Sequence, residues 1–192
     1  MAESSPVKQN EYASYREDLR RLRMSQHVRV AAAVGLSVNA VFVLLDWFVF
    51  PEYFLPFLAL RLAMSMVLVW VLFVASTRRP QLGAWTVCLT LAAGMVTMIF
   101  VDGPTSQYFA GLILLFCGMG VLLPLSASEA AGICGIVFSA FVASALFESV
   151  AFSWAEFRTN CFFLGSAAGM SVASCGFLDR LRMKDYVQRR EI

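Results

Sequence analysis

The chain has 192 residues, of which 59% are hydrophobic and 15% charged, and its net charge is +2. An ordinary soluble domain is about 45–50% apolar and about 25% charged, so these values exclude a soluble globular domain, a disordered tail and a disulfide-rich secreted scaffold. The small net charge provides no general basic field, and we predict no nucleic-acid partner. The composition predicts an all-α, polytopic membrane protein.

Six apolar stretches are long enough to cross a bilayer, since a spanning helix needs about 20 mostly apolar residues. In chain order they are Val30–Phe50, Phe54–Ser76, Leu82–Val101, Tyr108–Leu125, Ala130–Val150 and Thr159–Leu178. The links between them are short, which predicts three consecutive antiparallel hairpins. In this scheme residues 1–29 form a cytoplasmic N-terminal segment, residues 30–178 the transmembrane domain and residues 179–192 the start of a cytoplasmic helix.

The distribution of Lys and Arg predicts the orientation of the spans, because cytoplasmic loops are enriched in these residues. They concentrate before the first span, after the second and after the sixth. The opposite loops carry mainly acidic residues, namely Glu52, Asp102, Glu148 and Glu156, with the single basic residue Arg158. Both termini are therefore predicted to be cytoplasmic.

Both ends of the chain have helical patterns. Near the N-terminus, Tyr12, Tyr15, Leu19 and Leu22 recur at spacings of three and four, with arginines on the other faces. This amphipathic helix can lie on the inner leaflet or pack against a partner helix. At the other end, residues 177–192 contain no Gly or Pro, so we expect the sixth span to continue into the cytoplasm as one helix.

Asp46 and Arg61 are the deepest charges in the predicted spans, and a charge in the hydrocarbon is costly unless it is paired or hydrated. Both lie within about two turns of the outer boundary, and the first hairpin places them at similar depth. They form either a structural ion pair that fixes the hairpin or a polar anchor at the mouth of an outward-facing pocket. Asn39 adds a deeper polar group. Glu148, near the outer end of the fifth span, belongs either to a hydrated interfacial cluster or to the same ligand-binding mouth.

Small residues mark two spans as sites of close helix packing. Gly165, Gly169 and Ala173 recur at spacing four in the sixth span, a pattern that lets two helices approach closely. The stripe serves packing inside one chain or an interface between subunits. In the fourth span, Gly111, Gly118 and Gly120 predict another close or flexible crossing.

We find no constellation of residues typical of an enzyme. His27 is the only histidine and lies in the basic N-terminal segment, and the five cysteines lie within the spans without a Cys-x-x-Cys pair. There is no glycine-rich phosphate loop and no His-Glu-x-x-His motif. We therefore predict no catalytic residue, no metal site and no cofactor in these residues.

Three stretches carry a resemblance to a known group of proteins. They are Leu44-Leu45-Asp46-Trp47 with Pro51 and Leu60-Arg61-Leu62; Ser106-Gln107-Tyr108-Phe109-Ala110-Gly111-Leu112 with Leu122-Leu123-Pro124; and Arg180-Leu181-Arg182 with Tyr186 and Arg189-Arg190-Glu191. In these stretches the chain resembles the six-span N-terminal sensor modules of bacterial signalling enzymes. Those enzymes include membrane-bound class III adenylate and guanylate cyclases and histidine kinases that sense lipophilic quorum signals.

The resemblance implies a homodimer in the bacterial cytoplasmic (inner) membrane, in contact with membrane lipid and responsive to a lipophilic ligand. It adds Tyr108 to Asp46, Arg61 and Glu148 as a candidate for ligand binding or for a structural polar contact. The chain contains neither the metal-binding aspartates of a cyclase nor the phospho-accepting histidine motif of a kinase, so the resemblance implies an effector domain beyond residue 192.

Two other functions are compatible with a polytopic chain. A small transporter or channel would use Asp46, Arg61 and Glu148 to line its transport pathway. Against this, the cytoplasmic halves of the predicted spans have no charged residue near the middle of the membrane. A membrane enzyme of lipid chemistry would need a constellation of His, Asp or Glu at the inner surface. The carboxylates near that surface are Glu129, Asp179, Asp185 and Glu191. We favour the sensor module.

Overall fold

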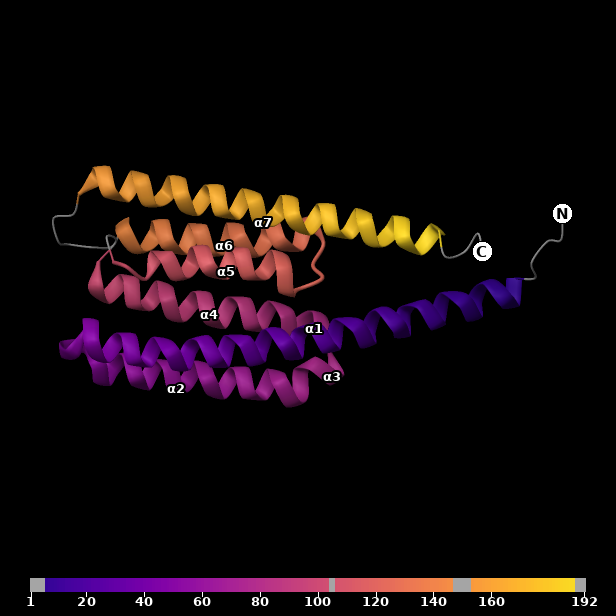
Figure 1. Cartoon of the computed structure of the whole chain (residues 1–192), viewed down its shortest axis with the longest axis horizontal. Helices are drawn as coiled ribbons and strands as arrows, with labels where there is room; N and C mark the ends of the chain where they lie inside the picture. The colour runs from indigo at the N-terminus through magenta and orange to yellow at the C-terminus, as the bar shows by residue number, and fades with distance from the viewer. Residues whose placement is uncertain (1–5, 104–105, 147–152, 189–192) are drawn as a thin grey trace.

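The computed structural model describes residues 6–103, 106–146 and 153–188 (Figure 1). Their regular structure is helical throughout, with no strand in these ranges, which confirms the all-α class. The elements are α1 (Pro6–Val49), the 3₁₀ turn η1 (Pro51–Tyr53), α2 (Phe54–Trp70), the π-helical segment η2 (Val71–Ala75), α3 (Ser76–Arg78), α4 (Pro80–Asp102), α5 (Phe109–Leu122), α6 (Ala127–Leu146) and α7 (Trp154–Gln188).

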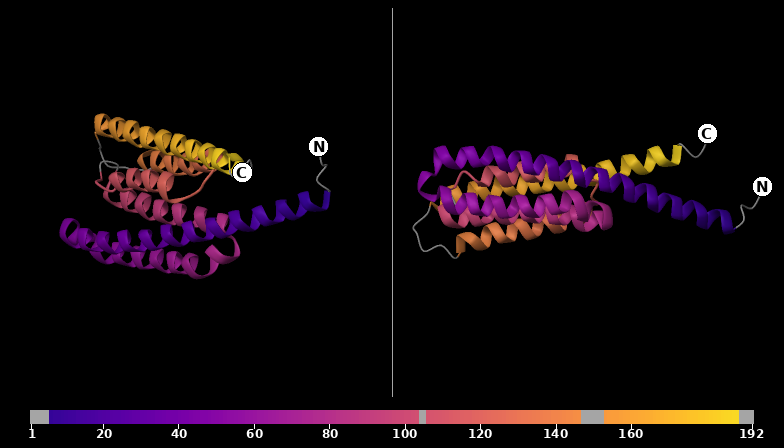
Figure 2. Two further views of the ribbon diagram at one scale, coloured as in Figure 1. Left: turned by 45° about the vertical axis from the view of Figure 1, so that its right-hand side comes forward. Right: turned by 90° about the horizontal axis from the view of Figure 1, so that it is seen from below.

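The helices lie side by side in an elongated bundle (Figures 1 and 2). α1 packs against α2 and α4, α4 also packs against α5 and α6, and α7 packs against α5 and α6. We call the end of the bundle that contains η1 the turn end. At the opposite end, the tail end, α1 and α7 both project beyond the other helices. The cytoplasmic location of these projecting ends of α1 and α7 stays a prediction.

Five described helical segments are long and apolar enough to cross a membrane: Met24–Val49, Pro51–Arg78, Pro80–Asp102, Ala127–Ala145 and Trp154–Leu181. The fourth predicted span is shorter than expected, because α5 has 14 residues and rises only about 21 Å, whereas the hydrocarbon core is about 30 Å thick. The helix ends where Leu123 adopts an extended backbone, as a residue before proline tends to do. Pro124 thus explains why the helix stops before Leu125.

The two terminal helices, α1 and α7, run without a break through the predicted boundaries between membrane span and cytoplasmic segment. From Pro6 onward, the predicted N-terminal segment and first span form one helix of 44 residues, which rises about 66 Å. α7 likewise has 35 residues, and it begins at Trp154 rather than at the predicted Thr159. The expected helical continuation of the sixth span beyond Leu178 is present as far as Gln188.

Glycines allow α4 and α5 to approach their neighbours closely. A Cβ atom added at Gly94 of α4 would lie 2.1 Å from Sδ of Met64 on α2, and one added at Gly111 of α5 would lie 2.8 Å from Sδ of Met95 on α4. Real Cβ atoms do not come so close to other atoms. With any larger residue at either position, the methionine side chain opposite would have to move.

Candidate functional site

The centre of the candidate site is a buried ion pair between α1 and α2. The exposed fraction of Asp46 is 0% and that of Arg61 is 2%. Arg61 donates to both carboxylate oxygens of Asp46, from Nε to Oδ2 and from Nη2 to Oδ1, the latter at 3.0 Å. A bidentate pair of this kind fixes both the distance and the relative orientation of the two side chains.

The remaining polar atoms of Arg61 also have partners. Nη1 donates to Oδ1 of Asn39 at 3.0 Å, and Nη2 lies 3.4 Å from the sulfur of Met98 on α4. Nδ2 of Asn39 donates to the backbone oxygen of Arg61 and to Oγ of Ser65, both at 3.0 Å. Burying two charges is costly unless the geometry is good and further hydrogen bonds satisfy them, and this cluster meets both conditions.

Tyr108 connects the ion pair to the start of α5. Its hydroxyl donates to Oδ1 of Asp46, and the residue is 2% exposed. The centre of the Arg61 guanidinium lies 5.8 Å from the Tyr108 ring centroid and 5.2 Å from that of Phe42, within the range of cation–π attraction. We use "polar cluster" for Asn39, Asp46, Arg61, Ser65 and Tyr108.

Aromatic rings pack beside the polar cluster at the turn end. Phe50 stacks on Tyr108 with the ring centroids 5.2 Å apart, and Phe57 meets Tyr108 edge-on at 5.7 Å. Tyr53 in turn stacks on Phe57 at 5.8 Å. The ion pair is thus enclosed by packed side chains rather than lining an open pore, which counts against a role as a pathway group in a transporter or channel.

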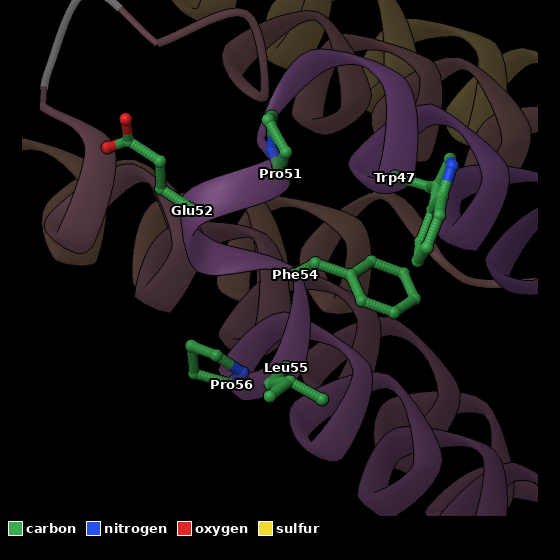
Figure 3. Close-up of a pocket in the computed structure, with 6 residues that line it drawn as sticks. All are labelled: Trp47, Pro51, Glu52, Phe54, Leu55 and Pro56. Atoms are coloured by element: carbon green, nitrogen blue, oxygen red, sulfur yellow. The ribbon is translucent and has the colours of Figure 1, made fainter.

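An open cavity of about 400 Å³ lies at the α1–α2 turn (Figure 3). Its lining residues are Trp47, Pro51, Glu52, Phe54, Leu55 and Pro56. The Trp47 and Phe54 rings are nearly perpendicular, with centroids 4.8 Å apart. Figure 3 shows the Glu52 carboxylate pointing away from the Trp47 ring, on the other side of Pro51. One of the two interpretations of Asp46 and Arg61 in the sequence placed an outward-facing pocket near this turn, but it did not identify these lining residues.

The other predicted site residues lie elsewhere. Glu148 is outside the described residues. Gly165, Gly169 and Ala173 lie on an exposed face of α7. A Cβ atom at Gly169 would meet nothing within 4 Å, and one at Gly165 would meet only the Phe138 ring, at 3.8 Å. The stripe therefore contributes little to packing within this chain.

The close approach of α7 to its neighbours uses other small residues. A Cβ atom at Gly120 of α5 would lie 3.4 Å from Oγ of Ser171 and 3.4 Å from Cβ of Ser174, both on α7. Two of the three glycines of the close crossing predicted for the fourth span thus lie against other helices, Gly120 against α7 and Gly111 against α4. Gly118, which belonged to the same prediction, faces open space.

No group of three or more His, Cys, Asp or Glu in the described part of the chain could hold a metal ion.

Comparison with known proteins identifies a family. The model of the MASE8 family, a family of membrane-associated sensor domains, matches residues 44–192. The match includes Asp46, Arg61, Tyr108 and all of α7. No curated protein and no solved structure matches the chain. Since the family model covers most of its length, the chain belongs to the MASE8 family.

Proposed function

We propose that this MASE8 domain detects a lipophilic ligand in the bacterial inner membrane and controls a cytoplasmic signalling enzyme, a nucleotide cyclase or a histidine kinase, through α7. The family supports a membrane-associated sensor. The observation that carries the mechanism is the position of α5, which joins the polar cluster to α7.

α5 is attached to the polar cluster at its first turn. Tyr108 directly precedes the helix, and its hydroxyl is bonded to Asp46 on α1. At the tail end, Nδ1 of His27 on α1 lies 3.1 Å from the carbonyl oxygen of Leu122. Because a carbonyl oxygen only accepts hydrogen bonds, Nδ1 is the donor. Both ends of α5 are therefore hydrogen-bonded to α1.

The flank of α5 packs against α7, and α7 is its most extensive packing partner. In the described residues, α1 and α2 do not pack against α7, so a change in the polar cluster reaches α7 through α5 or through α4 and α6. α5 is the shorter route, since it contacts both. A ligand that favours a state without the Tyr108–Asp46 bond would free the first turn of α5 and alter its packing on α7. The ligand must bind the two states with different affinity for this shift to occur.

We further propose that the active protein is a homodimer whose two copies of α7 meet at the small-residue face around Gly165, Gly169 and Ala173. This face is exposed in the single chain, and small residues allow close helix contact in a membrane. A rotation or shift of α7 would then change the contact between the two effector domains.

The experiment that tests this proposal is Tyr108→Phe in the full-length protein, with the output of its effector as the measurement. We expect the basal output to shift and to become less dependent on added ligand, because the substitution removes only the hydroxyl that links α5 to Asp46. Tyr53→Phe is the matched control, since it removes a hydroxyl from the same group of stacked rings. Equal outputs from both variants and the unmodified protein would refute the coupling.

A further inference from the structure

We infer that the projecting part of α1, residues 6–23, forms a parallel two-stranded coiled coil with the same segment of a second copy of the chain. This contact is separate from the α7 contact proposed above. It rests on the proposed homodimer only because the two copies must be neighbours in one membrane. The segment lies before the residues that the family model matches, so the contact does not follow from membership of the family.

The segment leaves the bundle as an unbroken continuation of a membrane-spanning helix. α1 runs from Pro6 to Val49 as one helix, and the part of it that is long and apolar enough to cross a membrane begins at Met24. Residues 6–23 rise about 27 Å and project at the tail end (Figures 1 and 2). Because the segment continues the direction of its own span, it points away from the membrane and does not lie flat on the inner leaflet.

The apolar residues of the segment lie on the side of α1 that faces away from the chain's own bundle. They are Tyr12, Tyr15, Leu19 and Leu22. At about 100° per residue along a helix, this stripe lies opposite Met24 and Val28, which are buried in the bundle. Gln26 and Ala33, which continue the stripe along α1, are exposed. The stripe is therefore on the wrong side of α1 to pack against its own chain.

The stripe has the spacing of a coiled coil. Its four residues occupy the a and d positions of two consecutive heptads, the positions that form the seam between paired helices. Two heptads are short for an isolated pair. Here, however, the helix is already formed as part of α1, and two copies in one membrane are held close together, so little further ordering is needed.

The charged residues beside the seam fit a second copy in parallel orientation. Glu11 and Asp18 occupy g positions, and Arg16 and Arg23 occupy e positions. In a parallel pair, each g residue meets the e residue of the following heptad in the other helix, which pairs Glu11 with Arg16 and Asp18 with Arg23. An antiparallel pair would place acid against acid and arginine against arginine. Two copies inserted the same way in one membrane can pair only in the parallel orientation.

The first test is photo-cross-linking of the whole chain in phospholipid vesicles. The photoreactive residue p-benzoylphenylalanine replaces either Tyr15, at a d position in the seam, or Glu17, at an f position on the other side of the helix. We expect a covalent dimer from the probe at Tyr15 and none from the probe at Glu17. Cross-linking of the Tyr15 probe to lipid instead of a second copy would overturn the inference, in favour of a helix on the membrane surface.

The second test reverses the charges beside the seam. Arg16→Glu with Arg23→Glu makes all four flanking positions acidic, and Glu11→Arg with Asp18→Arg makes all four basic. With the probe at Tyr15, each double variant alone should give about tenfold less covalent dimer. Vesicles that contain both double variants should recover the yield, because every g–e contact between the two different chains again joins opposite charges.

Arg20→Glu with Arg21→Glu is the matched control, because it changes the net charge as much as the acidic variant does, but at b and c positions outside the seam. It should leave the yield of covalent dimer unchanged. A loss equal to that of the acidic variant, or no recovery in the mixed vesicles, would overturn the inference. If the cross-links fail while spin labels at Leu181 still show two neighbouring copies of α7, the homodimer stands without this contact. If neither contact is found, the homodimer is refuted as well.

Discussion

The α1–α2 hairpin and the centre of α7 pack through different kinds of contact. In the hairpin, the bidentate Asp46–Arg61 pair and the hydrogen bonds of Asn39 fix the relative position of two helices. The centre of α7 instead meets α5 through small residues, and Oγ of Ser171 is buried there without a hydrogen-bond partner. Directional polar contacts specify one arrangement, whereas small residues let two helices lie close together. In the proposed function, the hairpin is the fixed part of the sensor and α7 is the moving part.

The largest effect is expected from Arg61→Leu, which breaks the fixed part. It leaves the Asp46 carboxylate buried without its cation, and removing one partner of a buried pair costs about 3–5 kcal/mol. The free energy of unfolding in mixed micelles measures this loss. Arg158→Leu, at an exposed arginine, is the control and should change stability by less than about 0.5 kcal/mol. Equal losses for the two variants would contradict the role given to the buried pair.

A smaller effect is expected from Gly94→Ala, which disturbs the packing of α4 against the hairpin. The new Cβ atom would lie 2.1 Å from the Met64 sulfur, so the Met64 side chain must move, and overpacking of this kind costs about 1–3 kcal/mol. The free energy of unfolding in mixed micelles is again the quantity to measure. Gly118→Ala, where nothing lies within 4 Å, is the matched control. A Gly94→Ala protein as stable as the control would show that the two helices are less tightly packed than described.

The smallest effect is expected at the moving part. Ser171→Ala removes a buried hydroxyl that has no hydrogen-bond partner. The free energy of unfolding should therefore stay the same or rise by up to about 1 kcal/mol. A loss of more than about 1 kcal/mol would reveal a polar contact that fixes α7, and the contrast between the two regions would then fail.

Much of the fold could be predicted from hydropathy and from residues that break helices. The apolar stretches located the helices because each must satisfy its own backbone groups in a bilayer. Pro124 stops α5, but the prediction extended the helix to Leu125 because the residues around the proline are also apolar. The N-terminal segment is polar and the first span is apolar. Because of this difference in composition, the sequence did not indicate that the two form one continuous helix.

The polar cluster could be predicted only in part. Asp46 and Arg61 belong to one hairpin, so their similar depth was visible in the sequence. The partner of Tyr108 was not visible, because its bond to Asp46 joins residues 62 positions apart on elements that meet only in the tertiary fold. Resemblance alone pointed to Tyr108. The orientation of the Gly165–Gly169 stripe was equally hidden, since it depends on which face of α7 meets α5 and α6.

The most direct test of the coupling through α5 is the distance between the two copies of α7 at the tail end of the proposed homodimer. A spin label at Leu181, introduced as a non-natural amino acid that leaves the five cysteines unmodified, reports this distance in the reconstituted protein. We expect one distance distribution for the unmodified protein and for Tyr53→Phe, and a shifted distribution for Tyr108→Phe. An unchanged distribution in Tyr108→Phe would show that α5 does not transmit the state of the polar cluster to α7.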